Sequence, residues 1–426
     1  MVVESVYIFN GHKFLDYIEV DKIKKDINGK FKVSEDIQKM NFPDYYSSLL
    51  VKFPNKKKEI GEIFFENIFY SHLKNVFIGE ILGHLNLEIE SFKKSVKELI
   101  KDINFKDTIP INLQKYMNED GFYLMDALNI SVPNTKFIAG YDFKEKDGRV
   151  VNARFLFVEV VPKRESGQVY YIAGVEIDFE KNLALTMVKN VNGLQKENSK
   201  TDTTIHQIHN TVQQKLFHKL GITLKKPVVT KDREGMFNFC RMLDGKLLED
   251  IRLDLDSRID IAVKDSVKNL NHALFNKTES LTNPDKNDLG KKIKALLLSY
   301  YIDYKITPND LVKKAKSDKL VGYPTRINFT SSKLSRGSTQ SANSKSPVSA
   351  SDMFHSLYFN FEQALGLDTW SISWFTDYKF NNPKDTDVIQ TTIYSTKNHF
   401  RVVFLPDRPL EKEIIHYVIR TIHSNR

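Results

Sequence analysis

Residues 136–191 carry the sequence KFIAGYDFKEKDGRVVNARFLFVEVVPKRESGQVYYIAGVEIDFEKNLALTMVKNV, in which four apolar runs alternate with three short polar breaks. Each run has the length of a strand, and its side chains alternate with the period of two that strands show. The breaks contain dipeptides that favour tight turns, namely Asp147-Gly148, Ser166-Gly167 and Lys181-Asn182. The sequence therefore predicts a four-stranded antiparallel meander over residues 136–192, in a chain of the α+β class.

The same alternation assigns side chains to the two faces of the meander, provided that each turn is a two-residue loop. One face is almost wholly apolar and is expected to be the core, with Arg154 as its only charged residue. The opposite face gathers four carboxylates and one lysine from neighbouring strands: Asp142, Glu159, Glu176, Asp178 and Lys189.

These five residues are candidate catalytic residues of a Mg²⁺-dependent nuclease, because carboxylates can hold the metal and a lysine can neutralise charge on the reacting phosphate. The order differs from the common Asp…Glu-x-Lys pattern, since Glu176 is followed by Ile177 and Asp178. Charges on the outer face of an antiparallel sheet are also expected without any metal. Mg²⁺ is thus the cofactor that the nuclease hypothesis requires, and the alternative is a protein with no cofactor.

The regions on either side of the meander show other patterns. Residues 1–135 open with two apolar runs around Asn10-Gly11, which predicts a β-hairpin, and they continue with helical spacing between residues 34 and 121. Residues 200–330 are predicted to be mainly helical. A helix over residues 286–304 is expected to turn its apolar stripe inward, with Leu289, Ile293, Leu296, Leu297, Tyr300, Tyr301 and Tyr304 facing the core.

A second helix is predicted to begin at Thr307, where Thr-Pro-Asn-Asp supplies an N-cap, a proline at the first helical position and an acid at the third. A helix, a short turn, a capped second helix and then a strand is the order found in helix-turn-helix modules with a β-wing. The helical middle of the chain is therefore predicted to contain a helix-turn-helix-like element.

Serine and other small polar residues dominate residues 331–351, SSKLSRGSTQSANSKSPVSAS. Such a segment buries little apolar surface, so we predict a flexible linker. Residues 352–426 are predicted to form a small C-terminal α+β unit. Within it, Trp370, Ile372 and Trp374 alternate along one strand, which favours a role as anchors of the core.

The net charge of the chain is +9, and nearly all of it comes from residues 285–350, where 13 Lys and Arg stand against 5 Asp. A local excess of this size attracts polyanions such as nucleic acids. The candidate nucleic-acid-binding residues are Lys291, Lys292, Lys294, Lys313, Lys314, Lys316, Lys319, Arg326, Lys333 and Arg336. A solvated basic helix beside a linker is the alternative interpretation of the same charges.

Other functional classes find little support in the sequence. The single cysteine, Cys240, excludes an internal disulfide and a Cys-rich zinc site, and no P-loop, Gly-x-Gly-x-x-Gly or kinase motif occurs. His206 and His209 lie one helical turn apart, but the His-Glu-x-x-His order is absent, so no metal ligand is predicted. The N-terminus lacks the features of a signal peptide, and no apolar run approaches the roughly 20 residues of a membrane span, so we expect a cytoplasmic protein without a membrane partner.

The function predicted from these patterns is that of a non-enzymatic nucleic-acid-binding subunit in a cytosolic assembly on DNA or RNA. Nucleic acid is the expected partner of the basic stretch, and other proteins are the expected partners of the remaining domains. A metal-dependent nuclease and a protein-interaction scaffold without a nucleic-acid role are the two alternatives. The abundance of Lys, Asn, Ile, Phe and Tyr is typical of AT-rich genomes, which agrees with a bacterial or phage-defence setting.

Overall fold

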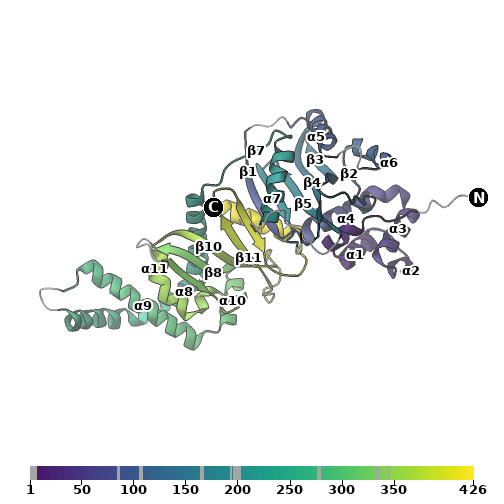
Figure 1. The fold of residues 1–426 in the computed structure, drawn as a ribbon. Coiled ribbons are helices and arrows are strands. Elements are labelled where there is room, and N and C mark those ends of the chain that lie inside the picture. Colours follow the sequence, from purple (N-terminus) through teal and green to yellow (C-terminus); the bar gives the residue numbers. More distant parts are fainter. Residues whose placement is uncertain are drawn as a thin grey trace, which may run out of the picture. The chain divides into compact units, whose positions relative to one another are not determined.

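The computed structural model describes residues 7–83, 87–104, 109–163, 167–191, 194, 203–275, 280–331, 336–343 and 345–426. The chain divides into two compact units. Unit 1 comprises Met1–Lys226 together with His399–Arg401 and Asp407–Lys412, and unit 2 comprises Pro227–Asn398, Val402–Pro406 and Glu413–Arg426. Helices accompany an antiparallel sheet in each unit, as expected for the α+β class (Figure 1).

Short helices form the first part of unit 1. They are η1 (His12–Tyr17), α1 (Val20–Lys30), α2 (Glu35–Gln38), α3 (Phe42–Lys52), η2 (Pro54–Lys56) and α4 (Lys57–Ser71). They are followed by β1 (Asn75–Leu82), α5 (Ile89–Ile103), α6 (Ile111–Gln114), η3 (Tyr116–Asn118) and β2 (Phe122–Tyr123). The prediction of helical structure from residue 34 to 121 is thus confirmed for most of this region but is wrong for β1, a strand buried in the sheet.

The predicted hairpin around Asn10-Gly11 is wrong, because the residues from His12 onward form the 3₁₀ helix η1. Gly11 has a φ of −78°, so it does not supply the positive φ of a two-residue turn. A Cβ at this position would lie 2.2 Å from the main-chain oxygen of Met125. The glycine therefore permits a close approach of two main-chain segments rather than a turn.

The predicted meander is confirmed. Its strands are β3 (Lys136–Lys146), β4 (Arg149–Pro162), β5 (Gln168–Asp178) and β6 (Leu183–Val188), and the strand order in unit 1 is β2-β3-β4-β5-β6-β1. Helix α4 packs on one face, where Phe65 and Phe69 contact Gly140 and Gly174. Helices α5 and α7 (Thr203–Val212) pack on the other face; α7 continues into a π-helical turn, η4 (Gln213–Phe217), and β7 (Thr223–Leu224) pairs with β1. Both faces are thus buried.

The strand register differs from the prediction at one point. The turn at Asp147-Gly148 has two residues as expected, but a bulge follows it, and Asp142 pairs with Arg154 instead of Ala153. Arg154 in turn pairs with Glu176 on β5. The prediction that Arg154 lies on the face opposite the carboxylates is therefore wrong, because one extra residue in a strand moves the following side chains to the other face.

Unit 2 is built on a 46-residue helix, α8 (Val229–Leu274), which runs against α9 (Asn283–Lys305). The distal parts of these two helices form a hairpin that projects beyond the sheet of unit 2 (Figure 1). Helix α10 (Pro308–Ser317), β8 (Gly322–Ser331), β9 (Arg336–Gln340), η5 (Val348–Ala350) and α11 (Asp352–Glu362) follow. The chain ends with β10 (Ala364–Phe375), β11 (Val388–Ser395), β12 (Phe400–Phe404) and α12 (Lys412–Asn425).

The core prediction for the C-terminal unit is confirmed, since Trp370, Ile372 and Trp374 of β10 are all fully buried. The predicted flexible linker over 331–351 is wrong for its described residues. Strand β9 pairs with β8 from Arg326 to Thr330, and Ser349 is buried. Main-chain hydrogen bonds to an existing sheet order this serine-rich segment, so it does not depend on apolar side chains.

The predicted order of helix, turn, capped helix and strand is confirmed, and Thr307 forms a capping box with Asp310. The packing differs from a helix-turn-helix module with a wing. Helix α9 packs on α8 and α11, α10 packs on α8 and β8, and β8 lies between β10 and β9 inside the sheet. A strand held on both sides cannot serve as a free wing.

The predicted inward stripe of α9 is also wrong in part. Leu298, Ser299 and Ile302 are the buried residues of this helix, while Leu296, Tyr300 and Tyr304 are 56%, 72% and 71% exposed. The helix has apolar residues on more than one side, so periodicity alone could not decide which side meets α8.

Candidate nucleic-acid interface

A cleft of about 1030 Å³ lies between the distal parts of α8 and α9. We call it the hairpin cleft. Residues from both helices and from the chain just beyond them line it: Asp260, Val263, Lys264, Val267, Lys268, Asn271, His272, Phe275, Ser280, Lys286, Asn287, Gly290, Lys291 and Lys294. Five lysines and one histidine therefore face a single carboxylate.

The carboxylate of Asp260 is already committed to two of these lysines. Its oxygens lie 2.7 Å from Lys264 Nζ and 2.9 Å from Lys294 Nζ. Hydrogen bonds from Lys264 and Lys294 lower the pKa of Asp260, and the hydrogen bond to Asp260 raises the pKa of Lys294. Among the residues that the structure describes, no carboxylate pairs with Lys268, Lys286 or Lys291, so their charges are available to an anion.

The α8 half of the hairpin cleft was missed by the sequence analysis. Lys264, Lys268 and His272 lie outside the basic stretch 285–350, and only the pairing of α8 with α9 brings them beside Lys291. The sequence does contain a signal for this half of the cleft. The three residues are spaced by four positions, so they lie on one side of a helix. Their neighbours in sequence include aspartates, which hid them in a count of net charge.

Three of the predicted nucleic-acid-binding residues are neutralised by carboxylates from other parts of the fold. Lys294 pairs with Asp256 and Asp260, and Lys314 pairs with Asp250 and Asp318. The buried Lys316 donates to the main-chain oxygen of Asp377 at 2.9 Å and to its carboxylate at 3.0 Å. These contacts stabilise unit 2 locally and weaken the field of the basic stretch.

The other predicted basic residues are dispersed. Lys291 and Lys292 are exposed on α9, and Lys313 is exposed on α10, with Lys319 just beyond its end. Arg326 is half-buried in β8, whereas Arg336 is exposed at the start of β9. Lys333 lies outside the described residues. Of the predicted set, the structure gathers only Lys291 and Lys294 into the hairpin cleft.

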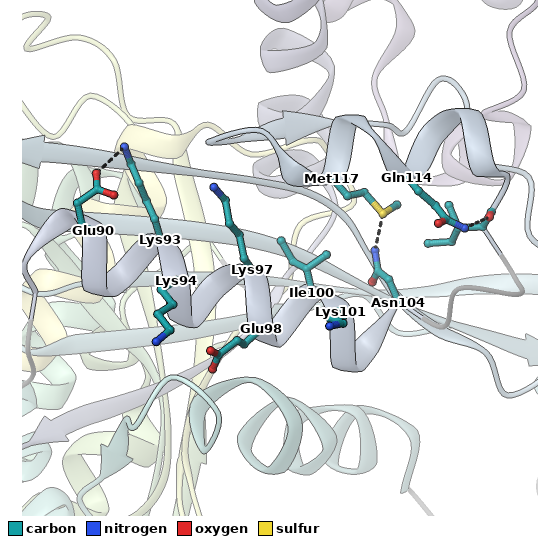
Figure 2. A pocket seen from close by; sticks show the side chains of 11 residues that line it. Glu90, Lys93, Lys94, Lys97, Glu98, Ile100, Lys101, Asn104, Gln114 and Met117 are labelled. Carbon is teal, nitrogen blue, oxygen red and sulfur yellow. Dashed lines mark hydrogen bonds and ion pairs between the residues drawn. The ribbon is translucent and has the colours of Figure 1, made fainter.

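A second lysine-rich cavity, of about 570 Å³, lies beside α5 in unit 1. Figure 2 shows Lys93 and Lys97 on one side of this helix and Lys94 and Glu98 on the other. Lys93 and Lys97 lie 2.8 Å and 3.5 Å from the carboxylate of Asp120, and Glu90 and Glu98 also line the cavity. Because most of its charge is balanced, this cavity is a weaker anion site than the hairpin cleft.

The predicted catalytic residues do not form one group. Asp142 and Glu176 share a face with Arg154, whereas Glu159 pairs with Lys136 on a different part of the sheet. Asp178 binds Lys181, and Lys189 donates to the main-chain oxygen of Asp16. Each charged group thus has a local partner of its own.

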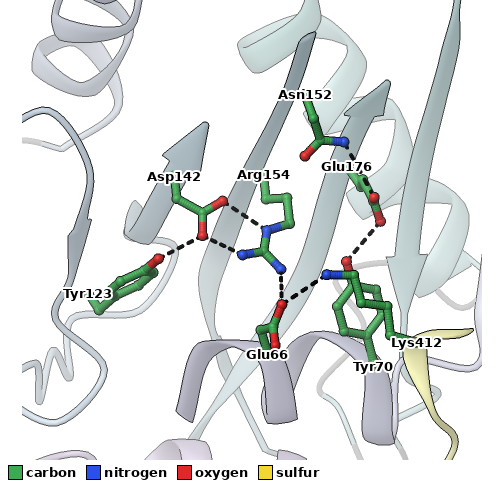
Figure 3. Close-up of polar contacts among 8 residues, drawn as sticks. All are labelled: Glu66, Tyr70, Tyr123, Asp142, Asn152, Arg154, Glu176 and Lys412. Atoms are coloured by element: carbon green, nitrogen blue, oxygen red, sulfur yellow. Dashed lines mark hydrogen bonds and ion pairs between the residues drawn. The ribbon is translucent and has the colours of Figure 1, made fainter. Parts of the chain in front are cut away.

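Asp142 and Glu176 belong instead to a polar network between α4 and the sheet (Figure 3). Arg154, which is 3% exposed, donates through Nε and Nη2 to Asp142 and through Nη1 to Glu66. The second oxygen of Asp142 also accepts from Tyr123, and Lys412 lies 2.9 Å from Glu66.

Glu176 completes this network and accepts hydrogen bonds from Tyr70 and Asn152. Burial lowers the pKa of Arg154, but its hydrogen bonds and its attraction to Asp142 outweigh this effect and raise the pKa overall. In the described part of the chain, no group of three His, Cys, Asp or Glu side chains could hold a metal ion. The arrangement is that of a buried ion network that holds α4 against the sheet.

Histidines cluster where α7 packs on β1. His209 stacks on Phe77 with ring centroids 4.1 Å apart, and the rings of His206 and His399 lie 4.5 Å from each other. Burial, followed by the charges of His399 and His206, lowers the pKa of His209 to about 3. Burial, followed by the charges of His206 and Arg401, lowers the pKa of His399 to about 4. Unit 1 therefore favours neutral imidazoles at this contact.

Acid is expected to weaken this contact. A histidine whose pKa is lowered by folding contributes its full stability above its unfolded pKa of about 6.5 and loses it as the pH falls toward the folded value. Between about pH 7 and about pH 5, His209 should lose about 2 kcal/mol of stabilisation. The measurement compares urea unfolding of the wild type with that of His209→Phe, which keeps a ring on Phe77 but cannot titrate.

This comparison is needed because burial raises the pKa of Asp126 and Asp244, whose protonation acts in the opposite direction. Both proteins share those carboxylates, so they cancel in the difference. A difference in unfolding free energy that stays constant with pH would contradict the prediction.

No protein-family model, curated protein or solved structure was found to match the chain. Its function must therefore be argued from the chemistry of its own sites. Each helix in the described residues is too short or too polar to cross a membrane.

Proposed function

We propose that this protein binds nucleic acid and that the hairpin cleft makes the principal contact with the phosphate backbone. The observation that carries this proposal is the excess of cations in the cleft, where Lys268, Lys286 and Lys291 lack carboxylate partners among the described residues. When ammonium groups that lack a carboxylate partner bind phosphates, counterions are released from the nucleic acid. This release is the main source of affinity in protein–nucleic acid complexes.

The position of the hairpin cleft supports a polymeric ligand. The α8–α9 hairpin projects beyond the sheet of unit 2, so a long chain can reach its end without meeting that sheet (Figure 1). Lysines approach from both helices, which suits a backbone that carries phosphates at regular intervals. Lys292 and Lys313 are exposed on α9 and α10 but do not line the cleft.

The contacts of the meander's acidic residues support a non-enzymatic role, because these residues are engaged in ion pairs and hydrogen bonds. Protein partners remain part of the proposal. The exposed side chains of Leu296, Tyr300 and Tyr304 on α9 support such contacts, since exposed apolar strips of this kind often meet other proteins.

Salt is expected to weaken nucleic-acid binding steeply. If three to five phosphates are neutralised, the affinity for duplex DNA should fall about 40- to 500-fold between about 50 mM and 200 mM salt, because log affinity changes with log salt by about −0.9 per contact. Fluorescence anisotropy with labelled DNA and RNA at several salt concentrations measures this slope. Binding that is absent at low salt, or independent of salt, would contradict the proposed function.

A further inference from the structure

We propose that the hairpin cleft receives an unpaired nucleobase, so that the protein prefers single-stranded nucleic acid over duplex. This inference rests on the proposed function and specifies its substrate class. A purely electrostatic site needs only surface lysines, whereas the hairpin cleft combines a lysine rim with a hollow and an apolar floor.

The floor of the hairpin cleft is suited to a flat, weakly polar group. Val263 and Val267 of α8 are buried beneath it, and the half-buried ring of Phe275 lies at its end. Stacking of a base on an aromatic side chain is favourable for every base, because each has a π-face. The exposed amide of Asn287 lies on the α9 side, where it can donate to or accept from a base edge.

A glycine keeps the hollow open. A Cβ at Gly290 would lie 3.7 Å from Val267 Cγ2 and 3.9 Å from Val263 Cγ1, which are ordinary van der Waals distances. Alanine therefore fits at this position without displacing a neighbour, whereas the branches of a leucine would extend further and fill the cleft. Every residue except proline favours a helix more than glycine does, so helix propensity does not explain its presence here.

The lysines at the rim of the hairpin cleft favour a ligand that carries phosphates beside its base. Lys268 of α8 and Lys286 and Lys291 of α9 lie on both sides of the apolar floor, so a base on the floor would leave its phosphates near ammonium groups. In duplex DNA the bases are stacked and paired inside the helix, and extracting one costs several kcal/mol. A single strand presents its bases without this cost, so the cleft should discriminate between the two forms.

Replacing Gly290 by leucine tests the inference, because it places a bulky side chain against Val263 and Val267 in the cleft without substituting any lysine. For Gly290→Leu, we expect the affinity for a labelled single-stranded oligonucleotide to fall about 10-fold, the loss that removal of one stacked base produces. The affinity for a duplex of the same sequence should change by less than about twofold, because phosphate contacts remain. Gly290→Ala is the matched control and should bind both ligands like the wild type.

Phe275→Ala provides a second variant, at a different position in the cleft, and it decides the question if Gly290→Leu does not fold. It should show the same selective loss for the single strand. Equal losses for single strand and duplex, or no loss for either ligand, would overturn the inference.

The failure of this inference can be distinguished from the failure of the proposed function. If charge reversal at Lys268, Lys286 and Lys291 abolishes binding but Gly290→Leu affects both ligands alike, the cleft binds backbone phosphates without a base. If the charge reversal leaves binding of both ligands intact, the hairpin cleft is not the nucleic-acid interface at all.

Discussion

Replacing Arg154 by methionine is expected to lower the free energy of unfolding of unit 1 by about 3–5 kcal/mol, the usual cost of breaking a buried ion pair. Arg154 is the centre of the network between α4 and the sheet, and its removal leaves the carboxylates of Asp142 and Glu66 without their shared cation. It also removes the guanidinium from above the ring of Phe65, which lies 5.2 Å away. Circular dichroism during urea unfolding measures the loss.

Two related variants control this measurement. Arg154→Lys keeps the charge but cannot form the forked contact with Asp142, so a smaller loss is expected. Adding Asp142→Asn to Arg154→Met should recover part of the stability, because it removes the unpaired charge. Both tryptophans, Trp370 and Trp374, lie in unit 2, so their fluorescence reports on that unit separately. An unchanged dichroism midpoint in Arg154→Met would show that the network contributes little.

Charge reversal in the hairpin cleft is expected to have the largest effect on binding. Replacing Lys268, Lys286 and Lys291 together by glutamate removes three cations and places three anions opposite the phosphates. We expect the affinity for single- and double-stranded DNA and RNA to fall at least about 100-fold at low salt, and the salt slope to become shallower. Anisotropy titrations against the wild type measure both quantities.

A matched control separates this local effect from a general change in net charge. Lys246, Lys384 and Lys397 are exposed lysines of unit 2 that do not line the hairpin cleft. Reversing these three residues changes the net charge by the same amount, yet it should alter the affinity only slightly. If both triple variants lose affinity equally, binding depends on overall charge and the cleft has no special role.

Part of the candidate interface could be predicted from the sequence. The charge excess of residues 285–350 pointed to α9, and Lys291 and Lys294 do line the hairpin cleft. The sequence could not show that Lys314 and Lys316 are engaged by Asp250 and Asp377, because those carboxylates lie about 60 positions away in either direction along the chain. A count of charges along the chain does not reveal which of them are neutralised across the fold.

The composition of the serine-rich segment 331–351 also could not predict how this segment is held in the fold. Its composition indicates that it could not build a core, which is correct, since strand β9 is held by main-chain pairing with β8. Composition describes what side chains can bury but not whether an unpaired strand edge is available nearby. The edge of β8 exists only because β10 holds β8 on its other side.

The sequence by itself determined those elements whose signals act over a few residues. Turn dipeptides and the alternation of apolar residues predicted the meander. Thr307 and Asp310 predicted the start of α10, and the alternation of Trp370 and Trp374 predicted a buried strand. Only the tertiary structure decided the bulge that turns Arg154 toward Asp142 and the pairing of α8 with α9 that creates the hairpin cleft. These features depend on hydrogen bonds and packing between distant segments, whose energies no short stretch of sequence contains.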